Sequence, residues 1–124
     1  MSPHVLVVED DSALVAEIDD AFRAQSLDTE FAPTATAAVM ALQNGRFDGI
    51  LLDLLLPDGH GLQVLDVLRA NSRKVPVIVM TRFLKDYQSE LVDYFPEVRL
   101  VAPKPFSAKT MAATMAQVIK KSAS

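Results

Sequence analysis

The stretch His-Val-Leu-Val-Val-Glu-Asp-Asp at residues 4–11 decides both the fold class and the chemistry that this chain suggests. Its apolar part is continuous, partly β-branched and bounded by polar residues, which is typical of a strand buried on both faces. A second run of this kind, Gly-Ile-Leu-Leu at 49–52, ends at Asp53. Because neighbouring parallel strands end at the same edge of a sheet, we expect Glu9, Asp10 and Asp53 to meet there.

Three carboxylates at one sheet edge repel one another, so such a site needs a cation or must hold extra protons. Hard oxygen ligands of this kind suit Mg²⁺ or Mn²⁺. The sequence therefore predicts an acidic metal-binding pocket. The alternative is that Asp10 and Asp11 merely favour the N-terminus of a following helix, and that Asp53 ends its strand as a turn former.

The composition is that of a globular domain of ordinary size. The chain has 124 residues, of which 50% are apolar and 23% are charged, and a domain of this length buries roughly two-thirds of its unfolded surface. It has no cysteine, which excludes disulfides and thiolate metal sites. The net charge of −4 argues against direct binding to nucleic acid, which needs a basic surface. Because no leader-like segment and no run of about 18 apolar residues is present, we expect a soluble cytoplasmic protein without a membrane partner.

Apolar periodicity predicts five strands that alternate with helices. The expected strands cover residues 4–8, 29–32, 47–52, 77–80 and 98–102. The expected helices begin after a cap at Ser12, cover 35–43 after a cap at Thr34 or Thr36, then about 62–71 and 86–94, and begin again after a cap at Ser107. Pro57-Asp58-Gly59 supplies turn residues after the third strand. This alternation indicates an α/β fold with a parallel sheet, right-handed crossovers and helices on both faces.

Two further polar residues stand where predicted strands end. Thr81 follows the fourth strand, and Lys104 follows the fifth. Ligands of open parallel sheets bind beyond the carboxyl ends of the strands. We therefore expect Thr81 and Lys104 beside the acids, although either residue taken singly is more often an ordinary strand or surface residue.

Four segments combine these features in one order: Val-Val-Glu-Asp-Asp at 7–11, Leu-Asp-Leu-Leu-Leu-Pro-Asp-Gly-His-Gly at 52–61, Val-Met-Thr at 79–81 and Lys-Pro-Phe at 104–106. Together they resemble the receiver domain of bacterial two-component response regulators. The resemblance implies a flavodoxin-like (βα)5 fold with strand order 2-1-3-4-5. It also implies a single receiver domain over residues 1–124 with no output domain in this chain, as in the stand-alone chemotaxis regulator.

For the acidic pocket, the resemblance implies that Asp53 accepts a phosphoryl group from a histidine kinase or a histidine phosphotransfer protein. Asp10 and Asp53 would bind Mg²⁺ directly together with the backbone carbonyl of Leu55, and Glu9 would act through water. The domain would then be a phosphoacceptor that catalyses its own phosphoryl transfer and its own slow dephosphorylation, rather than a classical enzyme.

The resemblance also implies that phosphorylation changes a binding surface. Thr81 would hydrogen-bond the phosphoryl group, Lys104 would pair with it, and Thr81 and Val101 would hold the switch positions. The added charge would bias the surface around the fourth helix, the fifth strand and the fifth helix toward an unknown downstream protein partner. We expect a monomer or weak dimer, and a cis peptide bond before Pro105.

Several residues depart from the family's pattern. Arg82 and Phe83 follow the fourth strand where the first residue is usually small, so they either obstruct the phosphoryl donor or, for Arg82, contact the phosphoryl group. Val101 replaces a residue that is commonly aromatic, so the usual coupling of threonine and aromatic rotamers is not assumed. Pro103 lacks a backbone donor, which fits an edge strand. Phe-Pro-Glu at 95–97 replaces the usual Gly-Ala turn and predicts an altered output face.

Two positions near the proposed acceptor predict a long-lived phosphorylated state. Leu55 and Phe83 stand where residues of the family admit or orient an attacking water molecule, and both are apolar. Because neither side chain can hold water by hydrogen bonding, we expect slow autodephosphorylation.

Three other functions are alternatives. Arg82 and Val101 leave open a phosphorylation-independent interaction module, or pseudo-receiver, that kept the fold. A flavodoxin-like nucleotide binder would need a Gly/Ser/Thr-rich loop after the first strand, where Glu9 and Asp10 instead repel phosphate. A phosphatase with an aspartate nucleophile would normally place a second acid at the position of Leu55. Both enzymatic alternatives are therefore disfavoured.

Overall fold

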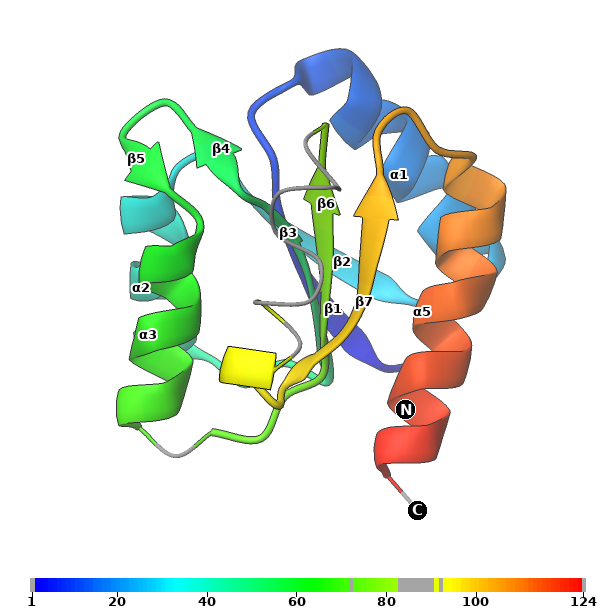
Figure 1. The fold of residues 1–124 in the computed structure, drawn as a ribbon. Coiled ribbons are helices and arrows are strands. Elements are labelled where there is room, and N and C mark those ends of the chain that lie inside the picture. Colours follow the sequence, from blue (N-terminus) through cyan, green and yellow to red (C-terminus); the bar gives the residue numbers. More distant parts are fainter. Residues whose placement is uncertain (1, 72, 83–90, 92, 124) are drawn as a thin grey trace.

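The computed structural model describes residues 2–71, 73–82, 91 and 93–123, and it forms one sheet of five parallel strands. The strands are β1 (His4–Val8), β2 (Asp28–Ala32), β3 (Gly49–Asp53), β6 (Val77–Thr81) and β7 (Val98–Pro103). Their order across the sheet is β2-β1-β3-β6-β7 (Figure 1). Numbered along the chain, this is the predicted order 2-1-3-4-5, so the predicted α/β fold is confirmed.

Helices cover both faces of the sheet, as the alternation of elements predicts. The helices are α1 (Ser12–Ala24), α2 (Ala35–Asn44), α3 (Leu62–Ala70) and α5 (Ala108–Ser122). α1 and α5 lie together on one face, and α2 and α3 cover the other (Figure 1). Most of the predicted helix over 86–94 lies outside the described residues, but residues 91, 93 and 94 are helical.

The residues of β1 show why the three inner strands of the sheet, β1, β3 and β6, are apolar along most of their length. Leu6 and Val8 pack into the core beneath α2 and α3, whereas Val5 and Val7 pack into the core beneath α1 and α5. All four side chains are inaccessible to solvent. Because successive side chains of a strand point to opposite faces, a strand covered on both sides has no position left for a polar residue. Polar residues therefore gather where the strands end.

The structure corrects the predicted cap of α1. Asp11, not Ser12, is the N-cap, because its Oδ1 accepts hydrogen bonds from the N–H groups of Ala13 (3.0 Å) and Leu14 (3.3 Å). A carboxylate at this position satisfies two otherwise unpaired donors, and its negative charge also suits the helix N-terminus. Ser12 becomes the first residue of the helix.

The structure also corrects the start of the third strand, which was predicted over 47–52. Phe47 is buried and its ring lies 4.8 Å from that of His4, but it pairs with no strand. β3 begins at Gly49 and continues through Asp53, which pairs with Met80 of β6. Burial rather than strand pairing thus explains the apolar residue at 47. The other predicted strands and the helices over 35–43 and 62–71 agree with the structure to within one residue.

Two other predicted helix caps are settled by single hydrogen bonds. The Thr34 hydroxyl, rather than that of Thr36, accepts from the N–H of Ala37 (3.0 Å) at the start of α2. The Ser107 hydroxyl accepts from the N–H of Thr110 (3.2 Å) at the start of α5, as predicted.

The predicted turn at Pro57-Asp58-Gly59 is the tip of a small hairpin that the sequence did not reveal. Its arms are β4 (Leu55–Leu56) and β5 (Gly59–His60), which pair antiparallel directly after β3 (Figure 1). Gly59 has a φ of 150°, a conformation that side-chain-bearing residues rarely adopt. Because β4 follows β3 directly, the hairpin lies at the same sheet edge as Asp53.

β7 is an edge strand, which explains how it accommodates a proline. Pro103 pairs with Thr81 on β6, the one neighbour that β7 has among the described strands, so its missing N–H interrupts no inner ladder. The peptide bond between Lys104 and Pro105 is cis, as the resemblance predicts.

Candidate functional site

The predicted acidic pocket lies where β1 and β3 end side by side. Val8 pairs with Leu52, so the residues that follow each of them, Glu9 and Asp53, emerge at the same sheet edge. One carboxylate oxygen of each of Glu9, Asp10 and Asp53 lies within 4.8 Å of the others. The structure therefore brings together the three acids that the strand pattern singled out.

Backbone hydrogen bonds orient the two buried carboxylates. Glu9 is 2% exposed, and its Oε2 accepts from the N–H groups of Asp10 (3.0 Å) and Asp11 (3.1 Å). Asp53 is 6% exposed, and its Oδ1 accepts from the N–H of Leu55 (3.1 Å). The carboxylate of Asp10 is exposed and makes no hydrogen bond or ion pair with any described residue. Asp10 is thus the acid with the most oxygen lone pairs available to a ligand.

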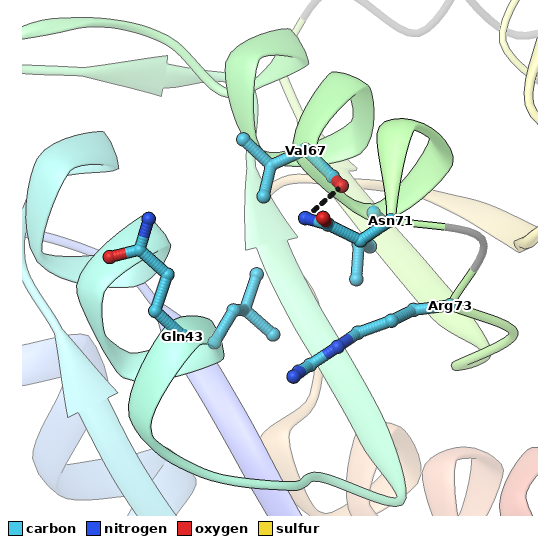
Figure 2. Close-up of a pocket in the computed structure, with 6 residues that line it drawn as sticks. Gln43, Val67, Asn71 and Arg73 are labelled. Carbon is cyan, nitrogen blue, oxygen red and sulfur yellow. Dashed lines mark hydrogen bonds between the residues drawn. The ribbon is translucent and has the colours of Figure 1, made fainter.

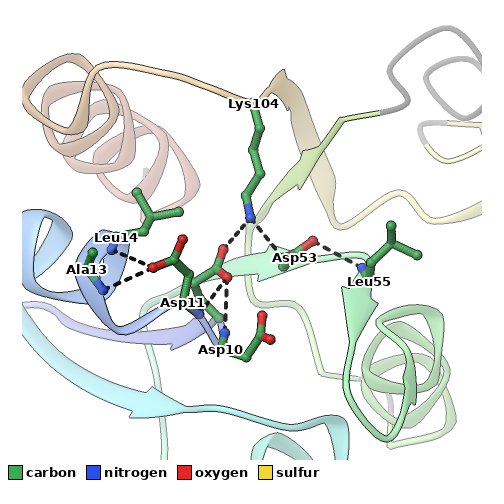
Figure 3. A network of polar contacts seen from close by, with 8 residues as sticks. Asp10, Asp11, Ala13, Leu14, Asp53, Leu55 and Lys104 are labelled. Atoms are coloured by element: carbon green, nitrogen blue, oxygen red, sulfur yellow. Dashed lines mark hydrogen bonds and ion pairs between the residues drawn. The ribbon is translucent and has the colours of Figure 1, made fainter.

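Lys104 connects the two buried acids across the sheet edge. Its Nζ lies 2.6 Å from Oε1 of Glu9 and 2.9 Å from Oδ2 of Asp53 (Figure 3). Its own N–H donates to the carbonyl of Thr81 at 2.9 Å, which ties the chain after β7 to the end of β6. One ammonium group therefore faces two carboxylates that have almost no access to water.

The charges of these groups follow from burial and from their contacts. Burial raises the pKa of the Glu9 carboxyl above its ordinary value, although hydrogen bonds from Lys104 and from the Asp11 N–H oppose the shift. Burial works to lower the pKa of Lys104, but its hydrogen bonds to Glu9 and Asp53 outweigh that effect and raise it. Lys104 is thus held in its charged form, and its single positive charge is shared between the carboxylates of Glu9 and Asp53.

A cavity of about 370 Å³ opens onto this cluster. Its lining residues are Glu9, Asp10, Asp11, Asp53, Leu55, Arg82 and Lys104. Arg82 and Leu55 are exposed on its wall, so both side chains at predicted modulating positions border the acids. Phe83, the third of these positions, lies outside the described residues.

The two predicted switch positions lie on neighbouring strands. Thr81 is 2% exposed at the end of β6. Val101 is 4% exposed and pairs with Val79, two residues before Thr81 on the same side of the sheet. A small buried residue at 101 therefore replaces the aromatic side chain that the resemblance leads one to expect there.

Asp58 at the tip of the hairpin and Gly61 directly after it make contacts that their sequence positions did not suggest. Gly61 lies so close to β3 that a Cβ atom there would meet the carbonyl oxygen of Asp53 at 2.5 Å. Asp58, predicted only as a turn former, accepts hydrogen bonds from the first turn of α2. No local signal reveals the second contact, because its partners lie more than 20 residues earlier in the chain.

A second cavity, of about 380 Å³, lies between the C-terminal ends of α2 and α3 (Figure 2). Two of its polar side chains are engaged within the chain: Asn71 donates to the carbonyl of Val67 (2.9 Å), and Arg73 donates to that of Gly45 (3.2 Å). None of the described residues that line it is an acid, and it lies at the opposite end of the sheet from Asp53. The acidic pocket is therefore the candidate site.

Comparison with known proteins identifies the family. The family model described as "Response regulator receiver domain" matches residues 5–116. The chain belongs to this family. This receiver domain is thus part of phosphorylation-based signalling and is a signalling domain rather than a classical enzyme, as the resemblance predicted.

Individual relatives share the receiver domain's sequence and fold. The DNA-binding response regulator MtrA of Mycolicibacterium paratuberculosis is 38% identical over 81 residues, which are 65% of this chain but only 36% of that protein. The receiver domain of a putative LuxO repressor protein from Vibrio parahaemolyticus superposes with a TM-score of 0.87 at 25% identity, over 99% of this chain and 94% of that one. The chain therefore matches about a third of the length of this curated relative.

A third relative was solved with a metal. The receiver domain of a sensor histidine kinase from Pseudomonas aeruginosa has a TM-score of 0.82 at 24% identity, over 97% of this chain and 99% of that one. Its structure contains a magnesium ion coordinated in the active-site cleft. At this identity the likeness establishes the shared fold. None of the helices in the described part of this chain has the length and apolar character that a bilayer-spanning helix needs.

Proposed function

We propose that this receiver domain accepts a phosphoryl group on Asp53 from a histidine kinase or a histidine phosphotransfer protein, with Mg²⁺ in the acidic pocket. The observation that carries the proposal is the cluster of three carboxylates within 4.8 Å, with Lys104 2.9 Å from Asp53. The phosphorylated domain would then bind a downstream protein partner. Residues 1–124 would serve this role as one receiver unit.

The donor set of the pocket fits a hard divalent cation. Asp10 and Asp53 would hold Mg²⁺ directly together with the backbone carbonyl of Leu55, because oxygen ligands are the ones that Mg²⁺ prefers. Glu9 would act through water, since Lys104 and two backbone N–H groups already occupy its carboxylate oxygens. Mn²⁺ has similar preferences and would substitute. The bound cation would neutralise the acids and allow an anionic phosphoryl group to approach.

The side chains around Asp53 suit in-line phosphoryl transfer. A carboxylate oxygen of Asp53 would attack phosphorus, the P–N bond to the donor histidine would break, and an acyl phosphate would form on Asp53. Lys104 is close enough to Asp53 to follow the negative charge onto the phosphoryl oxygens, and the hydroxyl of Thr81 would donate a hydrogen bond to one of them. Catalysis of this kind depends on positioning and on neutralising charge rather than on covalent chemistry by the protein.

The new phosphoryl group would alter the ends of β6 and β7. It adds a charge of about −1.5 to −2 and draws donors toward itself. Lys104 would exchange Glu9 for the phosphoryl oxygens, and its backbone bond to Thr81 links that movement to β6. Since Val101 is small and buried, we propose that the change reaches the surface through the chain after β7 rather than through an aromatic rotamer.

We propose a long lifetime for the phosphorylated state. Leu55 is 48% exposed on the cavity wall, so an apolar side chain that cannot hydrogen-bond water borders the cavity beside Asp53. Leu55→Asn should accelerate autodephosphorylation, and Phe83→Glu should do the same at the second position that the resemblance assigns to water. Unchanged or slower loss of radiolabel in both variants would contradict this explanation.

The second candidate function is a phosphorylation-independent interaction module, which Arg82 on the cavity wall and the valine at 101 favour. Acetyl phosphate or beryllofluoride with Mg²⁺ distinguishes the two, because only a phosphoacceptor should respond with changes in its amide NMR spectrum. Phosphotransfer profiling against histidine kinases then identifies the donor, with Asp53→Asn as the control. If Asp53→Asn still takes up label, Asp53 is not the acceptor.

A further inference from the structure

The tip of the β4–β5 hairpin is attached to the first turn of α2 by one side chain. Oδ1 of Asp58 accepts from the N–H of Ala35 (2.8 Å), and Oδ2 accepts from the N–H (2.9 Å) and the hydroxyl (2.6 Å) of Thr36. These hydrogen bonds lower the pKa of Asp58 to about 2, the Thr36 hydroxyl contributing most. The carboxylate is therefore charged at neutral pH and keeps its charge in more acidic solution than an ordinary aspartate does.

This attachment is additional to the ordinary cap of α2. The Thr34 hydroxyl already accepts from the N–H of Ala37 in the same turn. Asp58 accepts hydrogen bonds from the N–H groups of Ala35 and Thr36, which the Thr34 side chain does not bind. Its negative charge also complements the positive end of the helix. Helix capping alone would be served by a residue close in sequence, whereas Asp58 brings a distant segment to α2.

The attached hairpin contains a main-chain segment of the proposed metal site. Its base is held by the N–H of Gly61, which donates to the Leu54 carbonyl (2.7 Å), and by the N–H of Leu55, which donates to Asp53 (3.1 Å). Its arms have only two residues each, and two-stranded hairpins are marginally stable without further support. Leu55 thus lies between a base held by β3 and a tip held by α2.

We propose that Asp58 is a positioning residue, which holds the hairpin to α2 so that the Leu55 main chain stays in place for a divalent cation bound by Asp10 and Asp53. This inference rests on the proposed function and adds a determinant of cation affinity outside the pocket itself. By linkage, a cation in the pocket stabilises the contact between Asp58 and α2 in return.

The test compares Asp58→Ala with Asp66→Ala, which removes the same charge from an exposed position on α3. Asp66 makes no hydrogen bond or ion pair with any described residue, so it is a matched control. Calorimetric titration with Mg²⁺ should show a dissociation constant about tenfold higher for Asp58→Ala, as for residues that orient metal ligands. The phosphorylation rate with acetyl phosphate at saturating Mg²⁺ should fall less than the affinity, and Asp66→Ala should match the wild type in both.

Two conservative variants separate positioning from folding. Thr36→Val removes one of the three hydrogen bonds and should give a smaller loss of Mg²⁺ affinity, whereas Thr36→Ser retains the hydroxyl and should restore the wild-type value. A lower melting temperature for Asp58→Ala with unchanged Mg²⁺ affinity would overturn the inference and leave Asp58 as a helix cap only. Failure of the wild type to bind Mg²⁺ would instead overturn the proposed function, and this inference with it.

Discussion

Replacing Lys104 with methionine removes the one cation, among the described residues, that contacts both buried acids, and it keeps an unbranched apolar side chain. In the structure its Nζ lies 2.6 Å from Glu9 and 2.9 Å from Asp53, which are 2% and 6% exposed. Removing one partner of a buried ion pair typically costs about 3–5 kcal/mol, because the other charge remains buried and unpaired. For Lys104→Met without metal at neutral pH, we expect the free energy of unfolding to fall by about 3 kcal/mol. This is the lower end of that range, because Glu9 can bind a proton.

Both pH and Mg²⁺ should change the size of this loss. Because burial raises the pKa of Glu9, the folded state binds a proton more readily than the unfolded state, so folding stability increases as the pH falls from above the folded pKa toward 4.5. Without Lys104 the pKa of Glu9 should rise further. The difference in unfolding free energy between the wild type and Lys104→Met should therefore become smaller as the solution is made more acidic. Mg²⁺ should also reduce this difference in unfolding free energy, because the ion neutralises the same carboxylates and, in the variant, competes with no ammonium group for them.

Urea denaturation with and without excess Mg²⁺, at neutral and mildly acidic pH, measures these effects. Lys109→Met is the control, since Lys109 is exposed on α5 and makes no ion pair with a described residue, and it should stay within about 0.5 kcal/mol of the wild type. The reasoning is refuted if Lys104→Met unfolds at the wild-type urea concentration without metal, or if Mg²⁺ leaves the difference unchanged.

Three further predictions concern the hairpin and the cavity wall. Gly61→Ala should cost about 1–3 kcal/mol in urea denaturation, because its Cβ would meet backbone atoms that cannot move aside; Gly45→Ala, whose Cβ would meet nothing closer than 3.5 Å, should cost less, and equal midpoints would contradict the explanation. Asp58 should titrate near pH 2 in carbon-detected NMR, so its contribution to stability is present above pH 3.8 and is lost as the pH falls toward 2; Thr36→Val should return the pKa toward 3.8, and an unmoved pKa would show that the hydroxyl is not its cause. Arg82→Ala should slow uptake from acetyl phosphate roughly twofold to tenfold, most strongly at low salt, because a cation on the cavity wall attracts the anionic donor; faster uptake would mean that the side chain obstructs the site.

The course of the strands and the edge at which the acids gather could be predicted because both depend on short-range patterns. A strand covered on both faces is apolar, so the sequence of residues 4–8 predicts a buried strand. The acids that follow these residues must then lie where the strand ends. The parallel arrangement follows from alternation with helices, which brings Glu9 and Asp53 to one edge without any knowledge of their contacts.

Other features depended on segments distant in sequence meeting in space. Lys104 forms ion pairs with Glu9 and Asp53, which lie more than 50 residues earlier in the chain. Asp58 accepts hydrogen bonds from residues of α2 that lie more than 20 residues earlier. No periodicity encodes such pairs, because polar side chains near strand ends and turns have many possible partners until packing of the apolar core selects one. Short-range sequence patterns thus determined the strands, the helices and the sheet edge at which the acids lie. Tertiary packing determined which charged side chains contact one another at that edge.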